Sequence, residues 1–118
     1  MGPSSKRIRK LLREHTALAY EAELNRALAP LAQAFEQWKS GELSPHDLSD
    51  LIHAFHQGPA RDLYVRYTGE PGMQDVLVAH ALASGILDKE KVPRELLDHL
   101  RSQIEYWEQR ETPAPDEA

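Results

Sequence analysis

The sequence contains no cysteine among its 118 residues. Disulfide frameworks, thiolate catalysis and zinc sites built on cysteine are therefore excluded, and a cysteine-free chain fits a reducing compartment. Long apolar runs are missing as well. No stretch approaches the roughly 18 residues that span a bilayer, and the charged start of the chain lacks the apolar centre of a signal peptide. We therefore expect a cytoplasmic protein that does not cross a membrane.

The sequence also lacks the signatures of common enzyme folds. It has no glycine-rich phosphate loop, no Gly-x-Ser-x-Gly motif and no alternating apolar run typical of strands. Apolar residues instead recur every three or four positions, which is typical of helices. The pattern predicts an all-α fold, a compact bundle of about five helices. We expect one domain over residues 1–111, because a chain of this length buries about two-thirds of its unfolded surface. A disordered acidic tail is expected over residues 112–118.

Charge is distributed unevenly along the chain. The net charge is −5, but residues 1–13 contain no acid. The basic residues of this arm are Lys6, Arg7, Arg9, Lys10 and Arg13. Subtracting these five from 14 basic residues leaves nine against 19 acids in residues 14–118. An acidic body disfavours broad wrapping of nucleic acid, so only the basic arm is a candidate for phosphate contacts.

One long helix is predicted from about Ser5 to Ser40-Gly41, with two apolar stripes almost half a turn apart. The first stripe comprises Ile8, Leu11, Leu12, His15, Leu18, Ala19 and Ala22. The second comprises Ala17, Tyr20, Leu24, Leu28, Leu31, Phe35 and Trp38. We expect the second stripe to be buried in the domain and the first to face a partner, a second copy or a folded-back segment. Pro30 predicts a bend or break near residues 26–30.

The segment Ser44–Tyr67 is the best-marked part of the chain. Ser44 and Pro45 form a strong helix start, since Ser caps the first turn and Pro suits the first helical position. Gly58-Pro59 predicts an elbow between two short helices. Further on, residues 73–84 are apolar nearly all round and predict a deeply buried helix, and Pro93 begins a final one.

The candidate side chains of this segment are two histidines one helical turn apart, His53 and His56, followed by Arg61 and Tyr64. An elbow would bring them onto one concave surface, where Arg could clamp an anion and His and Tyr could exchange protons. Equally, the histidines could lie on a solvated or partner-facing helix side, and Arg61 and Tyr64 could serve packing and ion pairing. Because metal sites need three or four convergent ligands, we predict no metal and no cofactor.

Three functional hypotheses follow from these patterns. The leading one is a small non-enzymatic helical protein-interaction or regulatory module that binds another protein and also a second copy of itself. Its partner-binding residues are predicted to be Ile8, Leu11, Leu12, His53, His56, Arg61 and Tyr64. The alternative is a nucleic-acid-associated regulator or antitoxin-like protein that uses Lys6, Arg7, Arg9, Lys10 and Arg13. The third is a small metal- or acid–base-dependent enzyme that uses His53, His56, Arg61 and Tyr64.

Overall fold

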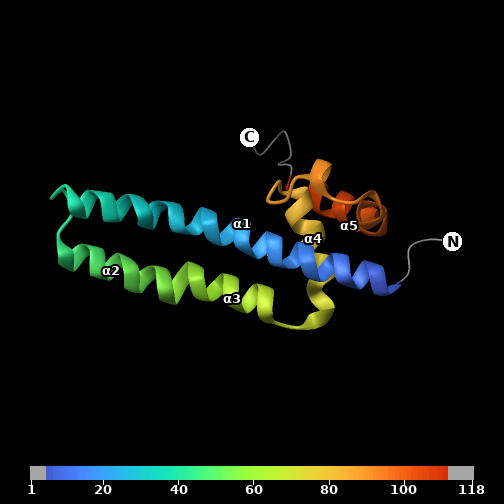
Figure 1. The fold of residues 1–118 in the computed structure, drawn as a ribbon, viewed down its shortest axis with the longest axis horizontal. Helices are drawn as coiled ribbons and strands as arrows, with labels where there is room; N and C mark the ends of the chain where they lie inside the picture. Colours follow the sequence, from blue (N-terminus) through green and yellow to red (C-terminus); the bar gives the residue numbers. More distant parts are fainter. Residues whose placement is uncertain (1–4, 112–118) are drawn as a thin grey trace. The chain divides into compact units, whose positions relative to one another are not determined.

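The computed structural model describes residues 5–111, and every regular element in this range is helical (Figure 1). The α-helices are α1 (Ser5–Lys39), α2 (Pro45–Phe55), α3 (Arg61–Thr68), α4 (Gln74–Ala83) and α5 (Arg94–Glu111). Short turns of π- or 3-10 helix join them: η1 (His56–Ala60), η2 (Pro71–Met73) and η3 (Lys89–Lys91). The all-α class and the long N-terminal helix are thereby confirmed. The acidic tail predicted over residues 112–118 lies outside the described residues.

The chain divides into two compact units that share α1. The core unit comprises Met1–Ala19 and Glu70–Ala118, and the hairpin unit comprises Tyr20–Gly69. The prediction of one domain over residues 1–111 stays a prediction, because it concerns whether the two units fold as one. No helix in the described range combines the length and the hydropathy that crossing a membrane requires.

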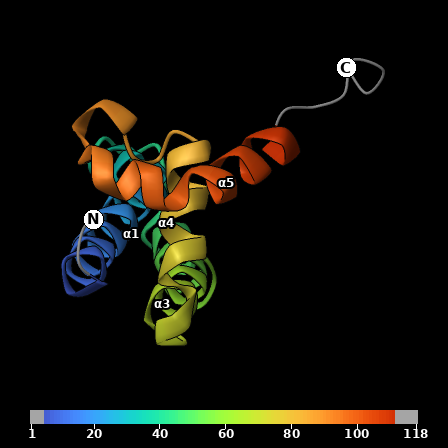
Figure 2. The ribbon, with the colours of Figure 1, turned by 90° about the vertical axis from the view of Figure 1, so that its right-hand side faces the viewer.

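The core unit is built by the first half of α1 together with α4 and α5, as Figure 2 shows from the side. Val78, Ala79, Ala81 and Leu82 of α4 are all buried, as the apolar pattern of this helix predicts. The buried cluster consists of Ile8, Leu11, Leu12, Val78, Ala79, Leu82, Val92, Leu96, Leu100 and Ile104. The first apolar stripe of α1 therefore packs against folded-back segments of its own chain. This corrects the expectation that Ile8, Leu11 and Leu12 form an external docking surface.

The hairpin unit packs the second half of α1 against the continuous run of α2, η1 and α3. Gly41, at φ 84°, ends α1 in the left-handed conformation that favours glycine. The backbone N–H of Glu42 then donates to the Gln37 carbonyl at 2.8 Å. Ser44 caps α2 by accepting a hydrogen bond from the Asp47 N–H at 3.0 Å, with Pro45 in the first turn. Both helix boundaries agree with the sequence-based expectation.

Two expected breaks do not occur. α1 is not split at Pro30 and continues as one helix, where alanine and leucine neighbours strongly favour helical backbone; the bend near residues 26–30 stays a prediction. The elbow at Gly58-Pro59 is also absent, since these residues lie inside the π-helical turn η1 and the chain stays helical from Pro45 to Thr68. A π turn widens the helix by using longer-range hydrogen bonds, so it accommodates a proline that lacks an N–H without changing the direction of the chain.

Candidate protein-interaction surface

The hairpin unit buries very little of its apolar side-chain surface. Within residues 20–69, only Ala34, Leu48 and Leu63 are fully buried apolar residues. Its exposed large hydrophobic residues are Leu28, Phe35, Trp38, Leu51, Ile52, Tyr64 and Val65. Two helices side by side cover only the narrow seam between them, and isolated helices gain most of their stability from packing. In the single chain, a broad apolar surface of the hairpin is therefore exposed to solvent.

One side of the hairpin collects most of these residues. A groove of about 570 Å³ runs between α1 and the η1–α3 segment, and its lining residues are Tyr20, Leu24, Leu28, Phe55, His56, Gln57, Ala60, Arg61 and Tyr64. At 100° per residue, Phe35 and Trp38 continue the same side of α1 toward the turn, and Ile52 continues the same side of α2. We call these twelve residues the docking face. It contains no acidic residue, and Arg61 is its one permanently charged side chain.

The other side of the hairpin differs in charge. A groove of about 450 Å³ there is lined by Glu23, Arg26, Ala27, Pro59, Asp62, Leu63 and Arg66. A third groove of about 270 Å³ contains no charged residue; it shares Ala27 and Pro59 with this charged groove and Phe55 with the docking face. A large apolar patch without charged residues is unusual on the surface of a monomeric protein. Such patches are typical of interaction sites. The docking face is the candidate site, because it combines the larger groove without acidic residues with five of the seven exposed large hydrophobic residues of the hairpin.

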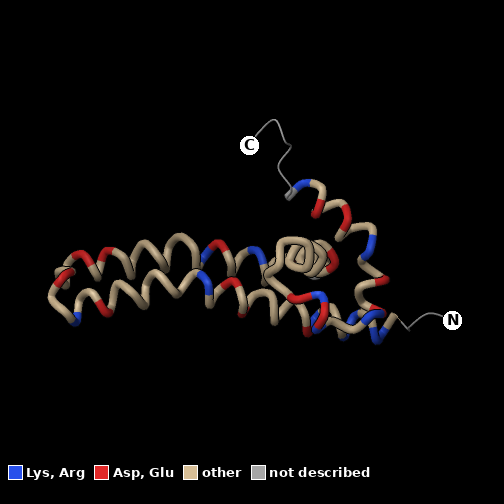
Figure 3. Tube along the Cα trace, turned by 90° about the horizontal axis from the view of Figure 1, so that it is seen from above, with Lys and Arg blue, Asp and Glu red and all other residues tan. Residues whose placement is uncertain are grey.

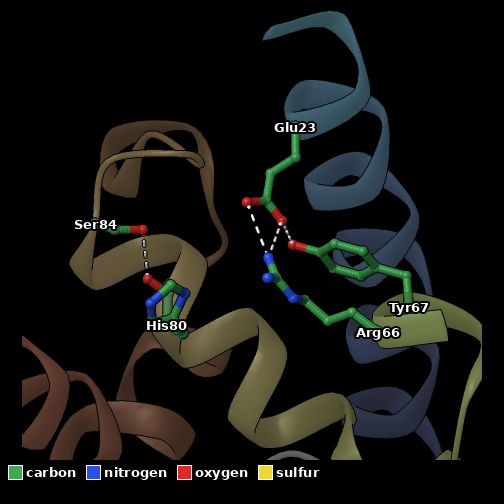
Figure 4. Close-up of polar contacts among 5 residues, drawn as sticks. All are labelled: Glu23, Arg66, Tyr67, His80 and Ser84. Atoms are coloured by element: carbon green, nitrogen blue, oxygen red, sulfur yellow. Dashed lines mark hydrogen bonds and ion pairs between the residues drawn. The ribbon is translucent and has the colours of Figure 1, made fainter. Parts of the chain in front are cut away.

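A polar cluster holds the base of the hairpin in place (Figure 4). The Tyr67 hydroxyl donates to a Glu23 carboxylate oxygen, and Arg66 Nη1 lies 3.3 Å from both oxygens of that carboxylate. Tyr67 also stacks on Tyr20, with ring centroids 5.1 Å apart and ring planes 8° apart. The Glu23 side chain is only 16% exposed. These contacts fix α3 against α1 and thereby set the width of the groove beside them.

The environment of Tyr67 predicts a pH dependence of stability. Partial burial, followed by the hydrogen bond to the Glu23 carboxylate, raises the pKa of the Tyr67 hydroxyl above its ordinary value. The neutral phenol is thus favoured in the folded state, so its stabilising contribution is complete below a pH of about 10 and is lost as the pH rises through the folded-state pKa.

We expect urea midpoints of the unmodified protein to fall above about pH 10 more steeply than those of Tyr67→Phe. At neutral pH the same substitution should cost about 1.5 kcal/mol, the contribution of a hydrogen bond to a charged group. Tyr106→Phe, at an exposed tyrosine of the core unit, is the matched control. Identical alkaline slopes for Tyr67→Phe and the unmodified protein would argue against this role of Tyr67.

The structure brings together three of the four polar residues predicted from the Ser44–Tyr67 segment. His56, Arg61 and Tyr64 line the same groove, whereas His53 is exposed and does not line it. Their proximity comes from a continuous helix rather than from an elbow. Within residues 5–111, no group of three His, Cys, Asp or Glu side chains is placed to hold a metal ion.

The apolar members of the docking face that lie on α1 are more exposed than the sequence predicts. Tyr20, Leu24, Leu28, Phe35 and Trp38 belong to the second stripe of α1, which was expected to be buried. In the structure most of the first stripe is buried, with Leu18 as the exposed exception, and much of the second is exposed. The spacing identified both stripes correctly, but it contains no information about which of them α4 and α5 cover.

The basic arm occupies the start of α1, where its positions cluster in Figure 3. All five basic side chains are exposed and lie opposite the buried Ile8, Leu11 and Leu12. Two of them pair with acids of the core unit: Arg7 with Glu95, and Lys10 with Glu14 at 4.0 Å. The Glu95 carboxylate raises the pKa of the Arg7 guanidinium through their hydrogen bond. The arm is thus a solvated cationic surface that is partly neutralised by its own chain.

Comparison with known proteins found no matching family model, no matching curated protein and no matching solved structure.

Proposed function

We propose that this chain is a non-enzymatic helical protein-interaction module that binds protein through the docking face of its hairpin. The observation that carries the proposal is the combination of exposed Leu28, Phe35, Trp38, Ile52 and Tyr64 with the absence of any acid on the same face. Aromatic residues and arginine are enriched at protein interfaces, and acidic residues are depleted there. A cytoplasmic location, favoured by the lack of cysteine, is part of this proposal.

The composition of the groove supports a protein partner over a reaction. Tyr64 is 60% exposed, so the groove does not exclude water from the histidine and arginine beside it. Enzymes generally surround their reacting groups with a dry, enclosed site. An open, apolar groove between two helices instead suits the apolar stripe of another helix.

In-cell photo-crosslinking tests this function. A photo-crosslinking amino acid in place of Leu28 should yield a discrete covalent adduct with protein, because the docking face is covered in the cell. The same amino acid in place of Val65 is the matched control: Val65 is 58% exposed and lies on the side of α3 that points away from α1. No adduct at position 28, or equal adducts at both positions, would contradict the proposed function.

The nucleic-acid alternative rests on the basic arm, whose exposed side chains lie opposite the first stripe. Lysine and arginine on one helix side can contact phosphates without base specificity. The basic arm offers five cations, two of which already pair with acids. It contains no aromatic residue for stacking on bases. A salt-dependent mobility shift that disappears when all five are changed to Gln would favour this alternative.

A further inference from the structure

We infer that the occupant of the docking face is a second copy of this chain, packed antiparallel so that the turn end of each hairpin covers the groove of the other. This inference rests on the proposed function and names its partner. The result is a two-fold symmetric four-helix bundle, in which α1 lies against α1 of the second copy and α2 and α3 lie against their counterparts.

The exposed large apolar side chains supply about half of the area that such a dimer needs. The five large exposed side chains of the docking face are between 37% and 60% exposed. At about 200 Å² for each large side chain, they offer roughly 400 Å². A standard interface buries about 800 Å² on each partner. Further area comes from the surrounding polar rim and from three half-buried residues, Tyr20, Leu24 and Phe55. Few hairpins of this size are stable alone, so association completes a core that the single hairpin lacks.

The shape of the face is complementary to itself. Near the turn, Phe35 and Trp38 form an edge-to-face pair with ring centroids 6.4 Å apart. The groove lies at the other end, beside Leu24 and the small residue Ala60. Leu24 and Phe35 are separated by about 16 Å along α1 at the α-helical rise per residue. A two-fold axis midway between these ends, near residue 30, places each aromatic pair in the groove of the other copy.

The charges favour the same direction. Residues 36–50, around the turn, carry the acids Glu36, Glu42, Asp47 and Asp50 against one base, Lys39, and Figure 3 shows this acidic end. Arg61 lies at the groove end, and the structure gives it no ion pair within residues 5–111. Antiparallel packing brings each acidic turn toward the Arg61 of the other copy. Turn-to-turn packing would instead place two acidic ends together, where like charges repel.

Single-cysteine crosslinking tests the arrangement, and the natural absence of cysteine removes any background. A bismaleimide with a span of roughly 8–10 Å matches the distance between packed helices. Leu28→Cys lies close to the inferred axis, so most of this variant should become covalent dimer at micromolar concentration. Val65→Cys, on the outer side, should remain monomeric on denaturing gels. Lys39→Cys should also remain monomeric, because antiparallel packing separates the two turns by roughly 25 Å.

The outcomes separate this inference from the proposed function. Crosslinking of Lys39→Cys without crosslinking of Leu28→Cys would overturn the antiparallel arrangement. The absence of crosslinking in all three variants would overturn the second copy as occupant. If position 28 still gives photo-adducts with a different protein in cells, the proposed function survives that failure. If it gives none, the proposed function fails as well.

Discussion

Replacing Leu12 by alanine is expected to lower the free energy of unfolding by about 2–5 kcal/mol. Leu12 is only 5% exposed and lies in the cluster that joins the start of α1 to α4 and α5. Truncation removes the transfer free energy of the lost methyl and methylene groups and leaves a cavity that close-packed neighbours fill only in part. Urea unfolding followed by circular dichroism measures this loss.

Leu18→Ala provides the matched control on the same helix. Leu18 is 48% exposed, so its truncation should change the free energy of unfolding by no more than about 0.5 kcal/mol. A small effect at both positions would mean that the first stripe of α1 is not part of a core. That result would restore the expectation that Ile8, Leu11 and Leu12 face a separate partner.

Replacing Leu28 by glutamate is expected to weaken dimerisation by at least about 100-fold. The substitution places a carboxylate on a face that has no acid and a single cation, Arg61, which in the inferred dimer faces the acidic turn of the other copy. An unpaired charge in a dry interface costs about 3–5 kcal/mol, and each 1.4 kcal/mol is a tenfold change in the dissociation constant. Both copies carry the substitution, which adds to the effect. Sedimentation equilibrium over a dilution series measures the change.

Val65→Glu is the control for added negative charge. It introduces the same carboxylate at an exposed apolar residue of α3, outside the docking face. We expect its dissociation constant to stay within about threefold of the unmodified protein, because exposed charges interact weakly across water. Equal weakening by both variants would show that net charge, rather than the docking face, controls association. The helical circular dichroism of each variant must match the unmodified protein for the comparison to hold.

Local signals in the sequence predicted the helix boundaries well. Ser44 with Pro45 begins α2, and Gly41 ends α1, because capping and left-handed backbone depend on residues at the boundary itself. Gly58-Pro59 was misread for a related reason. The pair favours a break in isolation, but tertiary contacts along the hairpin keep the backbone helical through a π turn.

The candidate site depended on information that spacing does not contain. The heptad-like spacing of Tyr20, Leu24, Leu28, Phe35 and Trp38 marked an apolar stripe, as did the spacing of Ile8, Leu11 and Leu12. Which stripe is covered depends on α4 and α5, which return to the first half of α1 from more than sixty residues later in the sequence. His56, Arg61 and Tyr64 were found because a continuous helix places them on one side about as well as an elbow would.

The mass of the unmodified protein in solution tests the central claim most directly. Light scattering coupled to size-exclusion chromatography, run over a range of loading concentrations, should give twice the 13.4 kDa mass of the chain. The mass should fall toward one chain only on strong dilution. A mass of 13.4 kDa at every concentration, in a protein with full helical signal, would contradict the account in which a second copy covers the hairpin.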